Sequence, residues 1–302
     1  MASTNSRISD VYSFGSSSKP TLILVNDEGL TALDVRPSIS QYISRLWKFR
    51  FFIRAEAIGK AFNAGRDTYL GKLWLVLEPL LQVSVYFLVF GMILKTDRGI
   101  DNYLGFLVIG VIFFGFVSKG ISSGSLLMQQ SSRLVSSFRF PRASIVVARA
   151  LRSFYDNLVP ALTAIVVAIC LQSTIQFHWR YFLAIPLFLL LHIFVLGATF
   201  IVARSTAFIP DLKSLVNLLT RALFFTSGVF FSIERFDANP TVAHFVELNP
   251  IYKFLSMFRM LILYGQTPEI SEWVYVSAWS FALLIVGFLY FWQAEERYAT
   301  LR

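Results

Sequence analysis

The sequence predicts an all-α integral membrane protein with six transmembrane helices per subunit, an N-terminal amphipathic interface helix and short external re-entrant helices. Two observations lead to this prediction. The 302 residues are 56% hydrophobic and include 31 Phe, and six runs approach the ~20 helical residues that cross about 30 Å of hydrocarbon. Because lipid offers no hydrogen-bond partner to unpaired backbone N–H and C=O groups, such runs are helices rather than isolated strands. The spans are expected at 73–94, 103–122, 144–171, 181–203, 215–233 and 273–293.

Lysine and arginine assign the two sides of the membrane, because these residues accumulate on cytoplasmic flanks. Residues 1–72 contain ten Lys or Arg, and the second and fourth connections are also basic. The first connection balances its charges, and the fifth, 234–272, carries five acidic residues. Both termini are therefore expected in the cytoplasm, and the segment of about 234–271 outside. Its apolar stretch 251–263 is too short to cross twice, which predicts a re-entrant or interfacial helical pair.

The part of the chain before the first span divides into a tail and an amphipathic helix. Apolar residues recur every three or four positions from Ile39 to Ala57, with cations on other faces. Such a helix lies in the inner interface of the bilayer, packs on a cytoplasmic partner, or does both. The organisation expected is a flexible cytoplasmic tail at 1–37, an interface helix and connector at 38–72, a transmembrane domain at 73–295 and a cytoplasmic end at 296–302.

Several classes of function lack the residues that they need. The net charge of +9 is spread along the flanks of the spans, which favours membrane lipid and not nucleic acid as the partner. The lone Cys170 allows no disulfide framework. None of the three His has a second ligand at helical spacing, so no metal or other cofactor is expected in this chain. No phosphate-binding Gly-rich loop with Lys occurs, so ATP must be hydrolysed by another chain.

The third span carries charges that are costly in a membrane unless they are paired or hydrated. Arg149, Arg152 and Asp156 are spaced by three and four residues, which makes them neighbours on a helix. Two interpretations stay open. The group is a structural ion pair with an Arg that reaches the membrane surface, or it also receives an anionic headgroup.

Four groups of residues, in order along the chain, resemble the permease subunits of ABC-2-type exporters. The resemblance covers about residues 40–295 and is similar to the branch that exports teichoic acids, O-antigen, capsule and other lipid-linked polysaccharides. The residues that carry it are Gly65 to Trp74 with Leu77-Glu78-Pro79-Leu80 and Val85-Tyr86-Phe87 to Phe90-Gly91, Arg133-Leu134-Val135 to Phe140-Pro141, Ser227-Gly228-Val229, and Leu248-Asn249-Pro250 with Arg259. Gly228 replaces the usual Pro of the family, Phe113-Phe114 stand where Trp is frequent, and Pro210-Asp211 replaces a common Arg-Asp pair.

The resemblance implies a permease in the plasma membrane of a bacterium. It implies a homodimer that works with two copies of a cytoplasmic ABC ATPase, which binds ATP and Mg, to move a lipid-diphosphate-linked polysaccharide outward. A teichoic acid, an O-antigen, a galactan and a capsule-like polymer are all compatible with it. One alternative is an ABC-2-type drug or small-lipid exporter. Another is a membrane glycosyltransferase or acyltransferase, which would need an acid or histidine constellation at the membrane edge, and none is visible.

The resemblance and the positions of charged and aromatic residues also give candidate site residues. Substrate headgroup reception is expected at Arg50, Arg54, Arg66, Arg149 and Arg152, because the planar guanidinium can donate two hydrogen bonds to a phosphate. Aromatic rings can stack on sugars, and the candidates to line the translocation path are Tyr86, Phe90, Phe113, Phe114, Phe224 and Phe225.

Two further groups are implied by the family pattern. Contact with the ATPase is expected in the connection between spans two and three, at Gln129, Arg133, Phe138, Arg139, Phe140 and Pro141. Phe138 and Phe140 would be apolar anchors suited to a cleft on that partner. The external gate over the exit of the path is expected at Asn249, Pro250, Tyr252 and Arg259.

Overall fold

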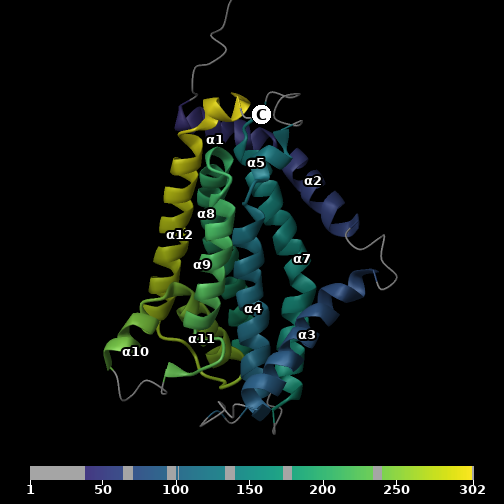
Figure 1. The fold of residues 1–302 in the computed structure, drawn as a ribbon, viewed down its shortest axis with the longest axis vertical. Coiled ribbons are helices and arrows are strands. Elements are labelled where there is room, and N and C mark those ends of the chain that lie inside the picture. The colour runs from purple at the N-terminus through teal and green to yellow at the C-terminus, as the bar shows by residue number, and fades with distance from the viewer. Residues whose placement is uncertain are drawn as a thin grey trace, which may run out of the picture. The chain divides into compact units, whose positions relative to one another are not determined.

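The structure is a computed structural model, and all regular secondary structure that it describes is helical (Figure 1). It describes residues 38–63, 71–93, 100, 102–132, 140–172, 179–233 and 240–300. The predicted tail at 1–37 lies outside these ranges.

Five helical segments are long and apolar enough to cross a membrane. The first combines α3 (Trp74–Tyr86) with the π-helical segment η2 (Phe87–Ile93), and the fourth combines η3 (Trp179–Leu183) with α8 (Ala184–Phe208). The others are α4 (Tyr103–Ser123), α7 (Ala143–Cys170) and α12 (Ile270–Trp292). The all-helical membrane fold is thus confirmed, whereas the number of six spans is not.

The fifth predicted span, 215–233, is shorter in the structure than expected. Its helix α9 (Leu212–Thr226) has 15 residues, which is about 22 Å at 1.5 Å per residue. It ends because the chain turns at Gly228, whose φ of +66° favours glycine. The predicted helical boundary at residue 233 was therefore wrong, since apolar composition continues through the turn although the helix does not.

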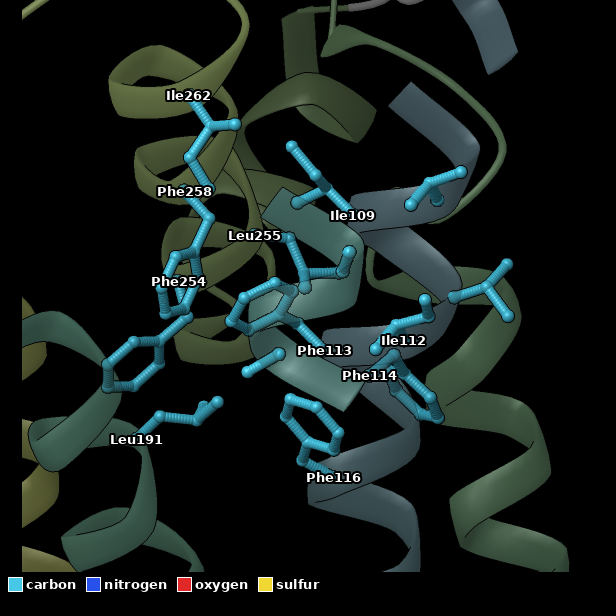
Figure 2. Close-up of a cluster of buried hydrophobic side chains, with 14 of the residues drawn as sticks. Ile109, Ile112, Phe113, Phe114, Phe116, Leu191, Phe254, Leu255, Phe258 and Ile262 are labelled. Atoms are coloured by element: carbon cyan, nitrogen blue, oxygen red, sulfur yellow. The ribbon is translucent and has the colours of Figure 1, made fainter. Parts of the chain in front are cut away.

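The α4 helix forms the centre of the main hydrophobic core. Its apolar residues pack against α7, α8 and α11 (Pro250–Ile262), and Figure 2 shows those that meet α11 and Leu191 of α8. Beside this core, α8 and α12 make the most extensive helix pair. Gly197 and Gly287 lie at their closest approach, where an added Cβ would meet the other backbone, as small residues allow in membrane helix pairs.

The predicted amphipathic helix consists of two helices. They are α1 (Ile39–Lys48) and α2 (Arg50–Asn63), separated by a turn at Phe49. The predicted apolar face is confirmed, because Tyr42, Ile53 and Ala57 are buried. A second cluster of buried apolar residues joins α1 to the starts and ends of other helices, including Ala143, Phe291 and Tyr298. The prediction of one continuous helix is therefore wrong. The sequence does not reveal the break, because no Gly or Pro marks it.

The opposite end of the bundle from α1 holds the short helices α10 (Pro240–Glu247) and α11 (Figure 1). A helical pair was expected there. α11 packs into the core of the bundle, because nine of its residues, from Ile251 to Ile262, are buried within the protein.

Candidate functional site

A cavity of about 220 Å³ with polar and apolar lining residues lies between α3, α4 and α7. We call it the α4 cavity. Its charged lining residues are Lys119 from α4 and Arg149, Arg152 and Asp156 from α7. Cations therefore outnumber acids in a space bounded by apolar helices.

A second cavity of about 200 Å³ lies between α2, the short helix α5 (Leu127–Gln130) and α7. We call it the α2 cavity. Its lining includes Phe52, Glu56 and Lys60 from α2, together with Arg149 and Arg152. The two arginines thus belong to both cavities.

The helical repeat of α7 places the polar residues of the α4 cavity along one stripe. From Arg149 the stripe continues three and four residues on to Arg152 and Ser153, then to Asp156 and Asn157, and then to Pro160. The Nε of Arg152 lies 3.4 Å from Oδ2 of Asp156. Arg149 is half-buried beside this pair, and within the described ranges it makes no hydrogen bond or ion pair of its own. The sequence prediction of an ion pair beside a further Arg is borne out by this geometry.

His192 of α8 holds the uncharged end of the stripe, at Asn157. The imidazole Nδ1 lies 2.9 Å from the Phe188 carbonyl, and Nε2 lies 3.1 Å from Nδ2 of Asn157. We assign the proton to Nδ1, because the carbonyl can only accept and the amide nitrogen can only donate. His192 therefore holds Asn157 in place at the wall of the cavity. Within the described ranges no three His, Cys, Asp or Glu side chains are grouped to hold a metal ion.

Of the other predicted reception residues, Arg50 and Arg54 line neither cavity. Arg50 donates to the Trp47 carbonyl at 3.2 Å and lies 4.4 Å from the centre of the Phe51 ring. Arg54 is exposed on α2, and Arg66 lies outside the described residues. Of the four predicted arginines that the structure describes, it therefore brings together two.

Five of the six predicted lining aromatics gather around a residue that the sequence did not single out, Phe230. The nearest rings to Phe230 are those of Phe90 at 4.2 Å, Phe224 at 5.0 Å and Tyr86 at 5.2 Å between centroids. Phe225 lies 5.9 Å away, and Phe114 joins the cluster through Phe224. The signal for Phe230 was its place just after Ser227-Gly228-Val229.

Phe113 does not belong to this aromatic cluster. It has no exposed surface and packs 4.0 Å from Phe258 in the core (Figure 2). Adjacent residues on a helix point about 100° apart, so Phe113 and Phe114 face different neighbours. The prediction that both line one path is corrected for Phe113.

The connection between α4 and α7 is anchored at both of its described ends. Gln129 donates from Nε2 to the carbonyls of Thr206 and Ala207, at 2.8 and 2.9 Å. At the other end Phe140 is 8% exposed and packs near Phe49 and Phe52.

Phe140 is therefore an internal anchor, which corrects the prediction that it projects toward a partner. Apolar character alone did not distinguish a docking residue from one that holds its own segment. Pro141 follows at the start of α7 and is also buried. Arg133, Phe138 and Arg139 lie outside the described residues.

A buried carboxylate that no sequence pattern indicated lies beside this anchor. Glu295, in the C-terminal helix η5 (Glu295–Thr300), accepts from the Tyr42 hydroxyl at 2.7 Å and from the Arg142 backbone N–H at 2.9 Å. The Tyr42 hydroxyl in turn accepts from the Ala143 N–H at 3.1 Å. Burial raises the pKa of both Glu295 and Tyr42 above their ordinary values.

The four predicted gate residues surround the turn after α9. Asn249 accepts from the Ile251 N–H and donates to Ser227, both at 2.9 Å, so it caps α11, where Pro250 takes the first position. Tyr252 lies against Gly228, since a Cβ there would come within 2.6 Å of its ring. Arg259 is buried, and desolvation lowers its pKa to about 10, so it remains a cation at neutral pH.

Comparison with known proteins gives the family. Residues 57–263 match the ABC-2 type transporter family. The chain is 23% identical over 235 residues to the O-antigen export system permease protein RfbA of Myxococcus xanthus, covering 78% of this chain and 88% of that protein. It is 21% identical over 240 residues to the protein of the same name in Klebsiella pneumoniae, with 78% and 88% covered. It is also 23% identical over 236 residues to the polysialic acid transport protein KpsM of Escherichia coli, with 76% and 88% covered. The chain belongs to the ABC-2 type transporter family of membrane proteins.

Proposed function

We propose that this protein is the permease of an ATP-driven exporter and moves a lipid-diphosphate-linked cell-envelope polysaccharide outward across the plasma membrane. The observation that carries the proposal is the pair Arg149 and Arg152 at the wall shared by the two cavities. The names of the relatives support the class of cargo, since they are an O-antigen and a polysialic acid transport protein.

The size of the α4 cavity supports a headgroup as the bound part. Its 220 Å³ is smaller than the roughly 300 Å³ at the low end of sites for drug-sized molecules. A diphosphate group is small and anionic, whereas a sugar chain would need a longer passage. We therefore assign the arginines to headgroup reception and not to the polymer.

The surroundings of the cavity suit a lipid that enters from the bilayer. In the first span, which includes α3, only 6% of the residues from Val76 to Ile93 are buried within the chain. Leu81, Val85 and Leu88 are among its exposed apolar residues. A lipid tail could remain against this surface while its headgroup contacts α7.

The aromatic cluster around Phe230 is the candidate wall for the sugar chain. Rings accept sugars on their faces without selecting one sequence of sugars. Phe225 is 58% exposed, Tyr86, Phe90 and Phe224 are half-buried, and Phe114 and Phe230 are buried. We propose that two copies of the permease enclose the path and that two copies of a separate ATPase supply the energy.

Reconstitution with the partner ATPase tests the function. The gene for that ATPase is sought beside the gene for this chain. Proteoliposomes that contain both proteins should move a lipid-diphosphate-linked glycan only with ATP, and the permease alone should hydrolyse none. Depleted cells should accumulate the same glycan on the inner leaflet. Export of small drugs instead of the glycan would contradict the proposal.

A further inference from the structure

We propose that Asp156 acts as an internal anion for Arg152, which the diphosphate of the substrate displaces, and that Arg149 makes the first contact with that diphosphate. This inference rests on the proposed function and deepens it. It assigns a different role to each of the three charged residues of α7.

Among the described residues around the two cavities, the charges pair except at one position. Glu56 pairs with Lys60 on α2, and Glu78 lies 3.9 Å from Lys119. Asp156 pairs with Arg152. The remaining cation is Arg149, whose electrostatic neighbours are Arg152 and Asp156. A half-buried cation beside a second cation is unfavourable, so the site favours an additional anion.

The contact of Arg152 with Asp156 leaves most of its donors available. It is a single hydrogen bond from Nε at 3.4 Å, whereas a guanidinium has five N–H donors and holds phosphate best through two parallel bonds. A bidentate phosphate contact is therefore stronger than the contact that it would replace. Arg152 also keeps an anionic partner throughout the exchange, first Asp156 and then the phosphate.

The position of Arg149 supports the order of contacts. Arg149 lines both the α2 cavity and the α4 cavity. An anion can therefore reach Arg149 through the α2 cavity and then pass into the α4 cavity, beside α3. Arg152 lies one turn further along the same face, and Asp156 one turn beyond it. An anion moving along this stripe meets Arg149, then Arg152, and then the carboxylate that repels it.

A phosphate at this site could come from the substrate lipid or from a membrane phospholipid. Two adjacent arginines favour a diphosphate, because its two phosphates can each occupy one guanidinium. The test therefore compares both sources. It uses the permease with its ATPase in lipid nanodiscs, and the probes are a labelled polyprenyl diphosphate, a polyprenyl monophosphate and phosphatidylglycerol.

Four variants separate the roles. Arg149→Gln and Arg152→Gln should each weaken diphosphate binding by about tenfold or more, the loss expected for one charge-assisted contact. Asp156→Asn should bind the diphosphate more tightly, by several-fold, and export it more slowly, because the competing anion is gone. Arg45→Gln is the matched control, since Arg45 is exposed on α1 and lines neither cavity, and it should change neither value.

The outcomes distinguish this inference from the proposed function. If the native complex exports the glycan but Asp156→Asn binds more weakly or unchanged, Asp156 only orients Arg152 and the exchange is refuted. If Arg149→Gln binds the diphosphate normally, the order of contacts is refuted. If phosphatidylglycerol competes as well as the diphosphate, the site serves membrane lipid. Failure of the native complex to export the glycan would instead refute the proposed function.

Discussion

The guanidinium of Arg259 donates to the carbonyl of Gly228 across 2.8 Å, and this contact joins α11 to the turn that ends α9. The same guanidinium donates to Val229 at 3.2 Å and to Phe106 of α4 at 3.3 Å. It also lies 3.3 Å above the centre of the Phe106 ring. Three elements that are distant in sequence are thus held by one buried cation.

Arg259→Lys should destabilise the permease although it keeps the charge. A single ammonium group cannot reproduce the fork that reaches several carbonyls, and each hydrogen bond to a buried charged group is worth about 1.5–3 kcal/mol. We expect a loss of at least about 2 kcal/mol, seen as a lower apparent Tm in detergent. A variant that unfolds at the native temperature would show that these contacts add little.

Restoring the usual proline of the family at Gly228 should destabilise this chain. Gly228 has a φ of +66°, whereas proline fixes φ near −65°. Gly228→Pro should therefore disrupt the turn and the bond to Arg259, and Gly228→Ala should cost about 1–2 kcal/mol for the left-handed backbone alone. The Tyr252 ring adds a clash. Expression and apparent Tm measure both effects.

Gly59→Ala provides the matched control for these glycine variants. Gly59 lies within α2, and nothing is within 4 Å of an added Cβ. Ala stabilises a helix interior by about 1 kcal/mol relative to Gly. The control should thus raise the apparent Tm slightly. A loss at Gly59 equal to that at Gly228 would mean that the measurement does not report on the turn.

Features set by spacing along one helix were accessible from the sequence. The stripe of Arg149, Arg152 and Asp156 follows directly from the helical repeat, and five of the spans follow from length and composition. Pairs that tertiary folding brings together were not accessible. Tyr42 and Glu295 are 253 residues apart, and neither periodicity nor composition indicates that they meet.

Helix boundaries failed where the composition did not change. Both the end of α9 at Thr226 and the break at Phe49 lie within continuous apolar patterns. The first coincides with a backbone turn secured by Arg259, and at the second the ring of Phe49 packs near the buried Phe140. Similarly, Phe113 and Phe114 look equivalent in sequence, but only packing shows that Phe113 faces α11.

Phe140→Ala should reduce stability more than it reduces binding of a partner. Phe140 is 8% exposed, and truncating a buried Phe costs about 3–5 kcal/mol. We expect a lower apparent Tm and a loosened α1 to α2 junction. Phe138→Ala should leave the Tm unchanged and weaken association with the ATPase, as the sequence predicts for a docking residue. Equal Tm losses for the two variants would contradict this division of roles.

Glu295→Gln should change how stability depends on pH. Burial raises the pKa of Glu295 despite hydrogen bonds from Arg142 and Tyr42, so the folded protein binds this proton more tightly than the unfolded chain. The resulting stabilisation is fully present below the ordinary pKa of about 4.5 and is lost as the pH rises through the raised folded value. Glutamine does not titrate, and its carbonyl can still accept from Tyr42. The native protein should therefore lose apparent Tm relative to Glu295→Gln as the pH rises from about 4.5 toward neutrality. Tyr42→Phe, which keeps the carboxyl, should retain a pH dependence of the native sign. A difference between native and Glu295→Gln that stays constant over this range would show that Glu295 has the same pKa in the folded and unfolded states.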